Sequence, residues 1–175
     1  MVESVPYAVV KTVDRVEIRH YPGLVLATVR GMSDDDAFGI LFRFISGLNA
    51  GGGKIPMTVP VVSAQKGERI PMTAPVLSGS NYFSFVLPSS FKAETTPRPI
   101  DDRVSIEEIP ARQVAVLRFR GSGSERQINE KTAELLTTLR NHNLSTVGES
   151  FLMRYNPPFI PGIFRKNEVG ISVAE

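Results

Sequence analysis

The period of the apolar positions changes along the chain. Two stretches carry apolar residues every three to four positions, which predicts helices. The first begins at Ser33, a good N-cap that precedes three aspartates, and is ended by the glycines at 51–53. The second begins at Ser124, with Gln127 completing a capping box, and runs to about Asn141. Short runs rich in β-branched and aromatic residues predict strands at 15–18, 24–29, 82–87, 103–106, 114–119, 151–155 and 168–173.

The two halves of the chain follow the same order. Arg15-Val16-Glu17-Ile18 before Pro22 is matched by Arg103-Val104-Ser105-Ile106 before Pro110, and a helix follows in each case. We therefore predict one domain, residues 1–175, with an internal pseudo-repeat of about 5–88 and 102–175. Two β-α-β-β units sharing one core give an α+β fold, a distorted antiparallel β-barrel flanked by two α-helices.

Two similar segments, 54–61 and 69–76, carry prolines four residues apart. Proline cannot donate a hydrogen bond to a strand ladder. The pattern therefore predicts edge strands or bulged strands for both. Met57 and Met72 stand in these segments, where core packing is the expected role of a flexible apolar side chain and ligating iron or lining a cavity is the alternative.

The first helix has more apolar surface than one sheet needs. One face carries Ala37, Ile40, Leu41, Phe44 and Leu48, and a second group beside it consists of Phe38, Phe42 and Ile45. Together they span roughly 200° of the helix at 100° per residue, wider than the stripe that docks a surface helix. The excess predicts a ligand or partner site. Coverage by the segment 151–166 as ordinary core is the alternative.

The segment 156–168 is unusually apolar for a loop, since loops normally run over the surface. Its prolines stiffen it, so its apolar side chains can be presented with little ordering cost. Those side chains are Phe159, Ile160, Ile163 and Phe164, and two basic residues, Arg165 and Lys166, follow at once.

Composition narrows the function. The formal net charge is only +2, from 20 basic and 18 acidic residues, which does not favour nucleic-acid binding. The absence of cysteine excludes disulfides, zinc–thiolate sites and cysteine-ligated heme. The N-terminus lacks the features of a signal peptide, and no run of about 20 apolar residues could span a membrane. We expect a cytoplasmic protein that binds neither nucleic acid nor membrane, as a monomer or weak oligomer.

Several segments together resemble the SOUL family of heme-binding proteins. The resemblance implies a distorted β-barrel with two helices, and heme or another tetrapyrrole between the first helix and the proline-rich loop near the C-terminus. It covers almost the whole chain and rests on the order and spacing of Val5-Pro6-Tyr7, Glu17-Ile18-Arg19-His20-Tyr21-Pro22, Phe44-Ile45-Ser46-Gly47-Leu48-Asn49, 54–61, Tyr155-Asn156-Pro157-Pro158 and Arg165-Lys166-Asn167-Glu168.

A porphyrin is a flat apolar plate with two carboxylates on one edge, so its site needs apolar walls and a cation at the rim. The resemblance places Arg43 near a heme propionate, and Lys54, Arg165 and Lys166 are further rim candidates. The predicted walls are Phe38, Phe42, Ile45, Phe159, Ile160, Ile163 and Phe164.

Iron ligation is less well specified. Neither His20 nor His142 lies clearly beside the first helix, although heme iron is usually held by His, Cys, Met or Tyr. The resemblance allows heme without a histidine ligand, so no metal-ligating residue is predicted.

Two other functions remain open. Gyrase-inhibitor-like and effector-binding domains resemble the same fold and bind apolar or cationic small molecules, typically through a buried acid, for which Glu107, Glu108, Glu149 and Glu168 are available. An enzyme would need a nucleophile–base pair or paired carboxylates. No Gly-x-Ser-x-Gly, His-Glu-x-x-His or phosphate-loop motif occurs, so heme binding without catalysis is the favoured hypothesis.

Overall fold

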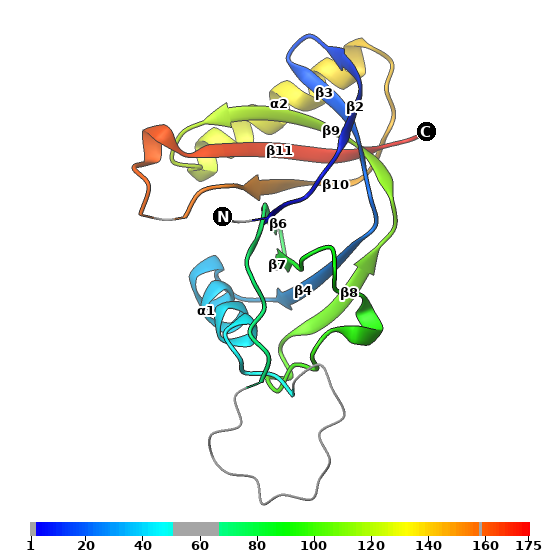
Figure 1. Cartoon of the computed structure of the whole chain (residues 1–175). Helices are drawn as coiled ribbons and strands as arrows, with labels where there is room; N and C mark the ends of the chain where they lie inside the picture. The colour runs from blue at the N-terminus through cyan, green and yellow to red at the C-terminus, as the bar shows by residue number, and fades with distance from the viewer. Residues whose placement is uncertain (1–2, 51–66, 158) are drawn as a thin grey trace, which may run out of the picture.

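A curled antiparallel sheet and two helices make up the computed structural model, which describes residues 3–50, 67–157 and 159–175 (Figure 1). Nine strands form the main sheet in the order β2-β3-β9-β11-β10-β6-β7-β4-β8. Their bounds are β2 (Ala8–Val13), β3 (Val16–Tyr21), β4 (Leu24–Arg30), β6 (Val76–Ser78), β7 (Tyr82–Val86), β8 (Ser105–Ile109), β9 (Arg112–Arg120), β10 (Thr146–Arg154) and β11 (Lys166–Val173).

The predicted α+β class is confirmed, with an antiparallel sheet and two helices. Within the described residues, β2 and β8 are the outer strands and do not pair with each other, so the sheet is an open half-barrel. Two short strands, β1 (Glu3–Ser4) and β5 (Thr73–Ala74), pair in parallel apart from it. Of the two proline-rich segments, 69–76 contributes β5 and the start of β6, and 54–61 lies outside the described residues. Two 3₁₀ turns, η1 (Ala93–Thr95) and η2 (Gly162–Phe164), complete the elements.

Both helices begin where their caps predicted. The Oγ of Ser33 accepts a hydrogen bond from the amide of Asp36 (3.3 Å) before α1 (Asp34–Ile45). The Oγ of Ser124 accepts one from the amide of Gln127 (3.2 Å) before α2 (Glu125–Asn141). The helix α1 ends earlier than predicted, because the backbone turns to a φ of +125° at Gly47. Leu48, predicted on the core face, consequently lies past the helix and is exposed.

The chain passes from one part of the sheet to the other at two proline turns, Pro22 and Pro110. At Pro22 it leaves β3, which pairs with β9, and enters β4, which pairs with β7 and β8. The strands β3 and β4, consecutive in the chain, therefore lie in different parts of the sheet. The internal repeat stays a prediction, since these pairings join strands from both halves of the chain.

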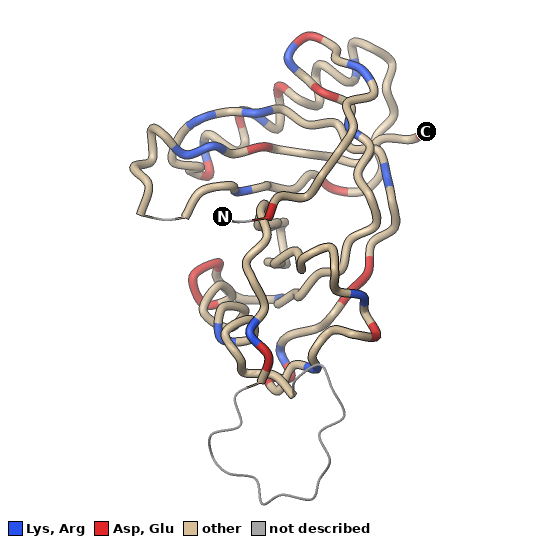
Figure 2. The backbone as a smooth tube through the Cα atoms, viewed as in Figure 1, with Lys and Arg blue, Asp and Glu red and all other residues tan. Residues whose placement is uncertain are grey.

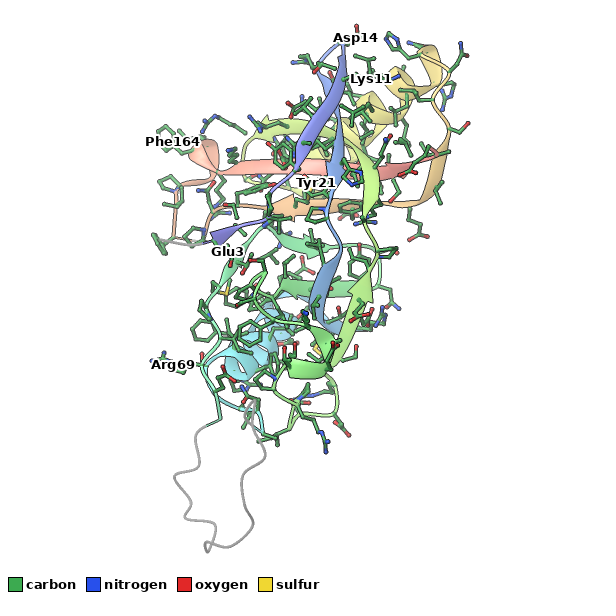
Figure 3. The ribbon with its side chains drawn as sticks, turned by 45° about the vertical axis from the view of Figure 1, so that its right-hand side comes forward. Glu3, Lys11, Asp14, Tyr21, Arg69 and Phe164 are labelled. Atoms are coloured by element: carbon green, nitrogen blue, oxygen red, sulfur yellow. The ribbon has the colours of Figure 1, made fainter. Side chains whose placement is uncertain are left out.

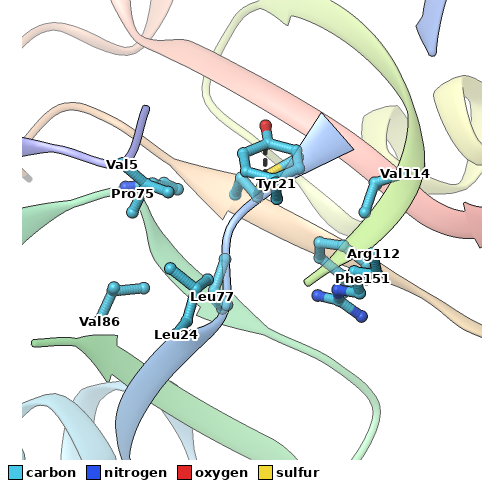
Figure 4. A pocket seen from close by; sticks show the side chains of 10 residues that line it. Val5, Tyr21, Leu24, Pro75, Leu77, Val86, Arg112, Val114 and Phe151 are labelled. Atoms are coloured by element: carbon cyan, nitrogen blue, oxygen red, sulfur yellow. Dashed lines mark hydrogen bonds between the residues drawn. The ribbon is translucent and has the colours of Figure 1, made fainter. Parts of the chain in front are cut away.

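Two separate cores result. The helix α1 packs on β4 and β7 through Leu41, Phe44 and their neighbours, and α2 packs on β9, β10 and β11 through Leu135 and Leu139. A third cluster lies at the seam between them, where Arg112 lies over the ring of Phe151 at 4.9 Å (Figure 4). The seam leaves a cavity of about 10 Å³, which has room for no more than a water molecule. The seam therefore has no room for an organic molecule.

Basic and acidic side chains are interspersed over the described elements, and the three aspartates that open α1 form one of the acidic stretches (Figure 2). They complement the partial positive charge at the helix N-terminus. No described helix is long and apolar enough to span a membrane.

Candidate functional site

An apolar groove of about 240 Å³ lies between α1, the segment 72–76, β7 and the end of β10. Phe38 lines it from α1, and residues 154–157 line it from the end of β10 and the start of the proline-rich loop. Its lining residues are Phe38, Met72, Thr73, Ala74, Val76, Phe83, Arg154, Tyr155, Asn156 and Pro157. The groove therefore joins the two segments that sequence analysis selected.

Phe38 is held in place by other aromatic rings. Its ring meets Phe85 edge to face at 5.4 Å and Phe83 at 6.5 Å between centroids, and it stacks on Phe42 at 5.9 Å. Edge-to-face and offset pairs at such distances are favourable arrangements. Phe42 is 48% exposed, so the aromatic surface continues outward from the groove along α1.

The proline-rich loop presents its apolar side chains to solvent. Phe159 is 82% exposed, Ile163 73% and Phe164 59%, whereas Ile160 is half-buried. In Figures 1 and 3 the loop, marked by Phe164, lies on the same side of the molecule as α1. Phe42 and these loop side chains are thus exposed apolar groups outside the groove lining, and exposed apolar groups that gather in a patch usually mark a binding site.

Ile45 and Arg43, two of the predicted site residues, lie away from the groove. Ile45 is only 4% exposed and packs in the core beneath α1, so it does not line the groove. Arg43 lines a different hollow, with Asp35, Asp36 and Arg103. The physical reason is helix geometry, because five residues from Phe38 to Arg43 turn the side chain by about 140°. Lys54 lies outside the described residues.

The predicted rim residues of the loop have internal partners. The Nε of Arg165 donates to the carbonyl oxygen of Ile160 at 2.8 Å, which closes the loop on itself. The Nζ of Lys166 lies 5.5 Å from the ring centroid of Tyr155. Both side chains are half-buried, and neither lines the groove.

Arg154 is the cation that sequence analysis missed. Among the described residues that line the groove, it is the only charged one, and its NH2 nitrogen lies 3.1 Å from a carboxylate oxygen of Asp34, the first residue of α1. Its position directly before Tyr155-Asn156-Pro157 was the available signal. Met72 packs against the core cluster of α1, as predicted, and it also lines the groove.

A buried ion-pair network stands behind the groove wall. Arg19 and Glu168, whose side chains are 0% and 1% exposed, form two hydrogen bonds of 2.9 and 2.7 Å between β3 and β11. Arg118 of β9 donates to the same carboxylate at 3.3 Å. Burial alone would raise the pKa of Glu168, but the hydrogen bonds from Arg19 and Tyr155 outweigh it and lower the pKa. Burial, together with the nearby Glu168 carboxylate, raises the pKa of Tyr155.

A second, more polar groove of about 850 Å³ lies between α2, β10 and the turn at 78–80. Asp34, Glu125 and Glu149 line it, and Arg154 lines it as well. Of the acids weighed from sequence, only Glu149 lies here, because Glu168 is buried with Arg19 and Glu107 pairs with Arg30. Arg154 and Asp34 therefore lie at the boundary of the two grooves.

The histidines lie away from the apolar groove. His20 is an exposed residue of β3, and His142 caps the end of α2, where its Nε2 lies 3.2 Å from Asp14. Neither lines the groove. No group of three His, Cys, Asp or Glu side chains placed to hold a metal ion occurs in the described part of the chain.

A family model described as SOUL heme-binding protein matches residues 2–172. The chain belongs to the SOUL family. Heme binding is the property that names this family, and the match spans the groove, both helices and the whole sheet. A search of the curated proteins finds no match to this SOUL chain.

Solved structures share the fold at low sequence identity. A structure described as a hydrolase from Listeria innocua is 13% identical, with a TM-score of 0.58 and 94% of each chain covered. The C-terminal domain of EcmrR is 10% identical, with a TM-score of 0.59 and coverage of 97% of this chain and 98% of that one. SAV2435 bound to tetraphenylphosphonium is 8% identical, with a TM-score of 0.51 and 92% and 94% covered. At such identities the likeness concerns the fold alone.

Proposed function

We propose that this protein binds heme or a related tetrapyrrole at the apolar groove, as a carrier or buffer and without catalysing a reaction. The observation that carries the proposal is that Phe38 and residues 155–157 line the same apolar groove in a chain of the SOUL family. The neighbouring exposed side chains of Phe42 and the loop enlarge the apolar surface available to a flat ligand.

The groove fits a porphyrin in chemistry and only partly in size. Its lining is almost entirely apolar, which suits the ring, and Arg154 suits a carboxylate. Pockets that enclose a small organic ligand usually have volumes of about 300–1,000 Å³, more than the 240 Å³ here. We therefore propose that one edge of the ring enters the groove while the rest lies against Phe42 and the exposed loop residues.

The walls, rather than an iron ligand, are proposed to supply the affinity. Of the four residue types that commonly hold heme iron, the groove offers Met72 and Tyr155. Burial raises the pKa of Tyr155 and so disfavours the phenolate that binds iron, which leaves the thioether of Met72. Bound heme would supply the iron, while this chain would supply apolar walls around the ring and the cation Arg154 at the rim of the groove.

Titration with hemin and with iron-free protoporphyrin tests the proposal. We expect a saturable Soret change near one equivalent of hemin, and a protoporphyrin affinity within about tenfold of the hemin affinity, since no strong iron bond is needed. No saturable change with either compound would refute the proposed function. Binding of hemin alone would instead indicate that an iron ligand dominates.

A second candidate function is binding of an organic cation in the larger groove. The observation in its favour is that the described lining of this groove of about 850 Å³ carries three carboxylates, of Asp34, Glu125 and Glu149, and one guanidinium, of Arg154. SAV2435, which shares the fold, is bound to such a cation, tetraphenylphosphonium. Tight binding of tetraphenylphosphonium by this chain, with no saturable binding of hemin, would favour this second function.

A further inference from the structure

We propose that Arg154 recognises a carboxylate on the ligand of the apolar groove and exchanges its ion pair with Asp34 for one with that carboxylate. The inference rests on the proposed function and makes it more specific. The ligand class is a flat apolar molecule with a carboxylate on its edge, and Arg154 takes the role that the sequence assigned to Arg43.

Arg154 is placed where it can meet a charged group of the ligand. It is the last residue of β10, and it is the sole charged side chain among the described residues lining the groove. A guanidinium presents five donors in a planar fork that matches a carboxylate. An apolar ligand with an anionic edge would therefore find its one complementary charge here.

The ion pair between Arg154 and Asp34 is weak enough to be exchanged for another partner. Within the described residues, Asp34 is the ion-pair partner of Arg154, at 3.1 Å, and the two side chains are 47% and 35% exposed. Ion pairs that are this exposed contribute little to stability. Asp34 also lies in the first turn of α1, where the helix dipole stabilises a negative charge without Arg154. Exchange of Asp34 for a ligand carboxylate should consequently cost little.

The other cations are less available to such a ligand. Arg43 lines another hollow, beside Asp35 and Asp36, and Arg165 closes its own loop onto Ile160. The groove also holds an unused hydrogen-bonding group. Thr73 lines the groove and is 3% exposed, and its Oγ1 is the one buried side-chain oxygen or nitrogen without a hydrogen-bond partner in the described part of the chain. Buried polar groups are rarely left unpaired, so this hydroxyl is a further observation in favour of a polar ligand atom.

The test compares hemin with its dimethyl ester, in which both carboxylates are neutral, on the full chain. We expect wild type to bind hemin about tenfold more tightly than the ester. Arg154→Met should weaken hemin binding about tenfold and leave ester binding unchanged. Arg43→Met is the matched control and should alter neither affinity.

Asp34→Asn gives a result of opposite sign. Because Asp34 competes with the ligand for Arg154, its neutralisation should strengthen hemin binding by about threefold, whereas a merely structural ion pair would give no gain. Equal effects of Arg154→Met on hemin and on the ester, or no effect on either, would overturn the carboxylate assignment while leaving the proposed function intact. Failure of wild type to bind either compound would overturn both.

Discussion

Replacement of Glu168 by glutamine is expected to lower the free energy of unfolding by about 3 kcal/mol or more. The reason is that Arg19 has a fully buried side chain and would lose the charge that compensates its own. The interactions with Glu168 raise the pKa of Arg19 against the effect of its burial, so the guanidinium cannot escape by losing its proton. Urea denaturation of wild type and of the variant measures the difference.

Glu107→Gln is the matched control for this prediction. Glu107 pairs with Arg30 between β8 and β4, but both side chains are considerably more exposed than those of Arg19 and Glu168. Its loss should cost less than about 1 kcal/mol. Equal losses in the two glutamine variants would show that burial of the Arg19–Glu168 pair does not matter energetically.

The same pair predicts a dependence on pH. The pKa of Glu168 in the folded protein is below its ordinary value of 4.5, so its contribution is fully present above that pH. As the pH falls below 4.5 and toward the lowered pKa, the carboxylate takes up a proton and the contribution is lost. The difference in stability between wild type and Glu168→Gln should therefore be constant near neutral pH and shrink in acid.

Phe38→Asp is expected to weaken hemin binding by about a hundredfold or more. The substitution removes the aromatic wall of the groove and places a carboxylate where the proposed ligand needs an apolar contact. It also brings a negative charge toward the anionic edge of the ligand. Soret titration of the variant measures the change, and circular dichroism checks that the variant is folded.

Phe91→Asp separates a loss of binding from a loss of stability. Phe91 is half-buried and packs against the same core cluster as Phe38, but it does not line the groove. Both variants should be destabilised, while Phe91→Asp should keep an affinity close to that of wild type. Parallel losses of hemin binding in the two would contradict the assignment of the groove.

Local signals in the sequence were sufficient for most of the fold. Ser33 and Ser124 fixed both helix starts through their hydroxyl caps, and the alternating apolar runs located the long strands. The early end of α1 depended on one backbone angle at Gly47, while the three glycines farther on gave a competing signal. The strand partners of β3 and β4 could not be derived from local pattern, because pairing is decided by contacts distant in sequence.

The candidate site was predicted in part. The apolar excess selected the first helix and the proline-rich loop, and the groove is lined by Phe38 of that helix and by Asn156 and Pro157 of that loop. Arg43, the predicted rim cation, does not line the groove, and helical angles alone separate it from Phe38 by about 140°. Arg154 was not selected, although it directly precedes Tyr155-Asn156-Pro157, because its ion pair with Asp34 joins residues 120 positions apart and local pattern does not indicate such contacts.

A tetrapyrrole is proposed to bind in the groove lined by α1 and residues 154–157. The most direct measurement is an NMR titration of the isotopically labelled protein with zinc protoporphyrin, a diamagnetic analogue of heme. The account predicts that the largest chemical-shift changes occur at Phe38, Met72, Val76 and residues 154–157. Changes concentrated instead at Asn129, Thr132 and Glu149, in the larger groove, or no changes at all, would contradict it.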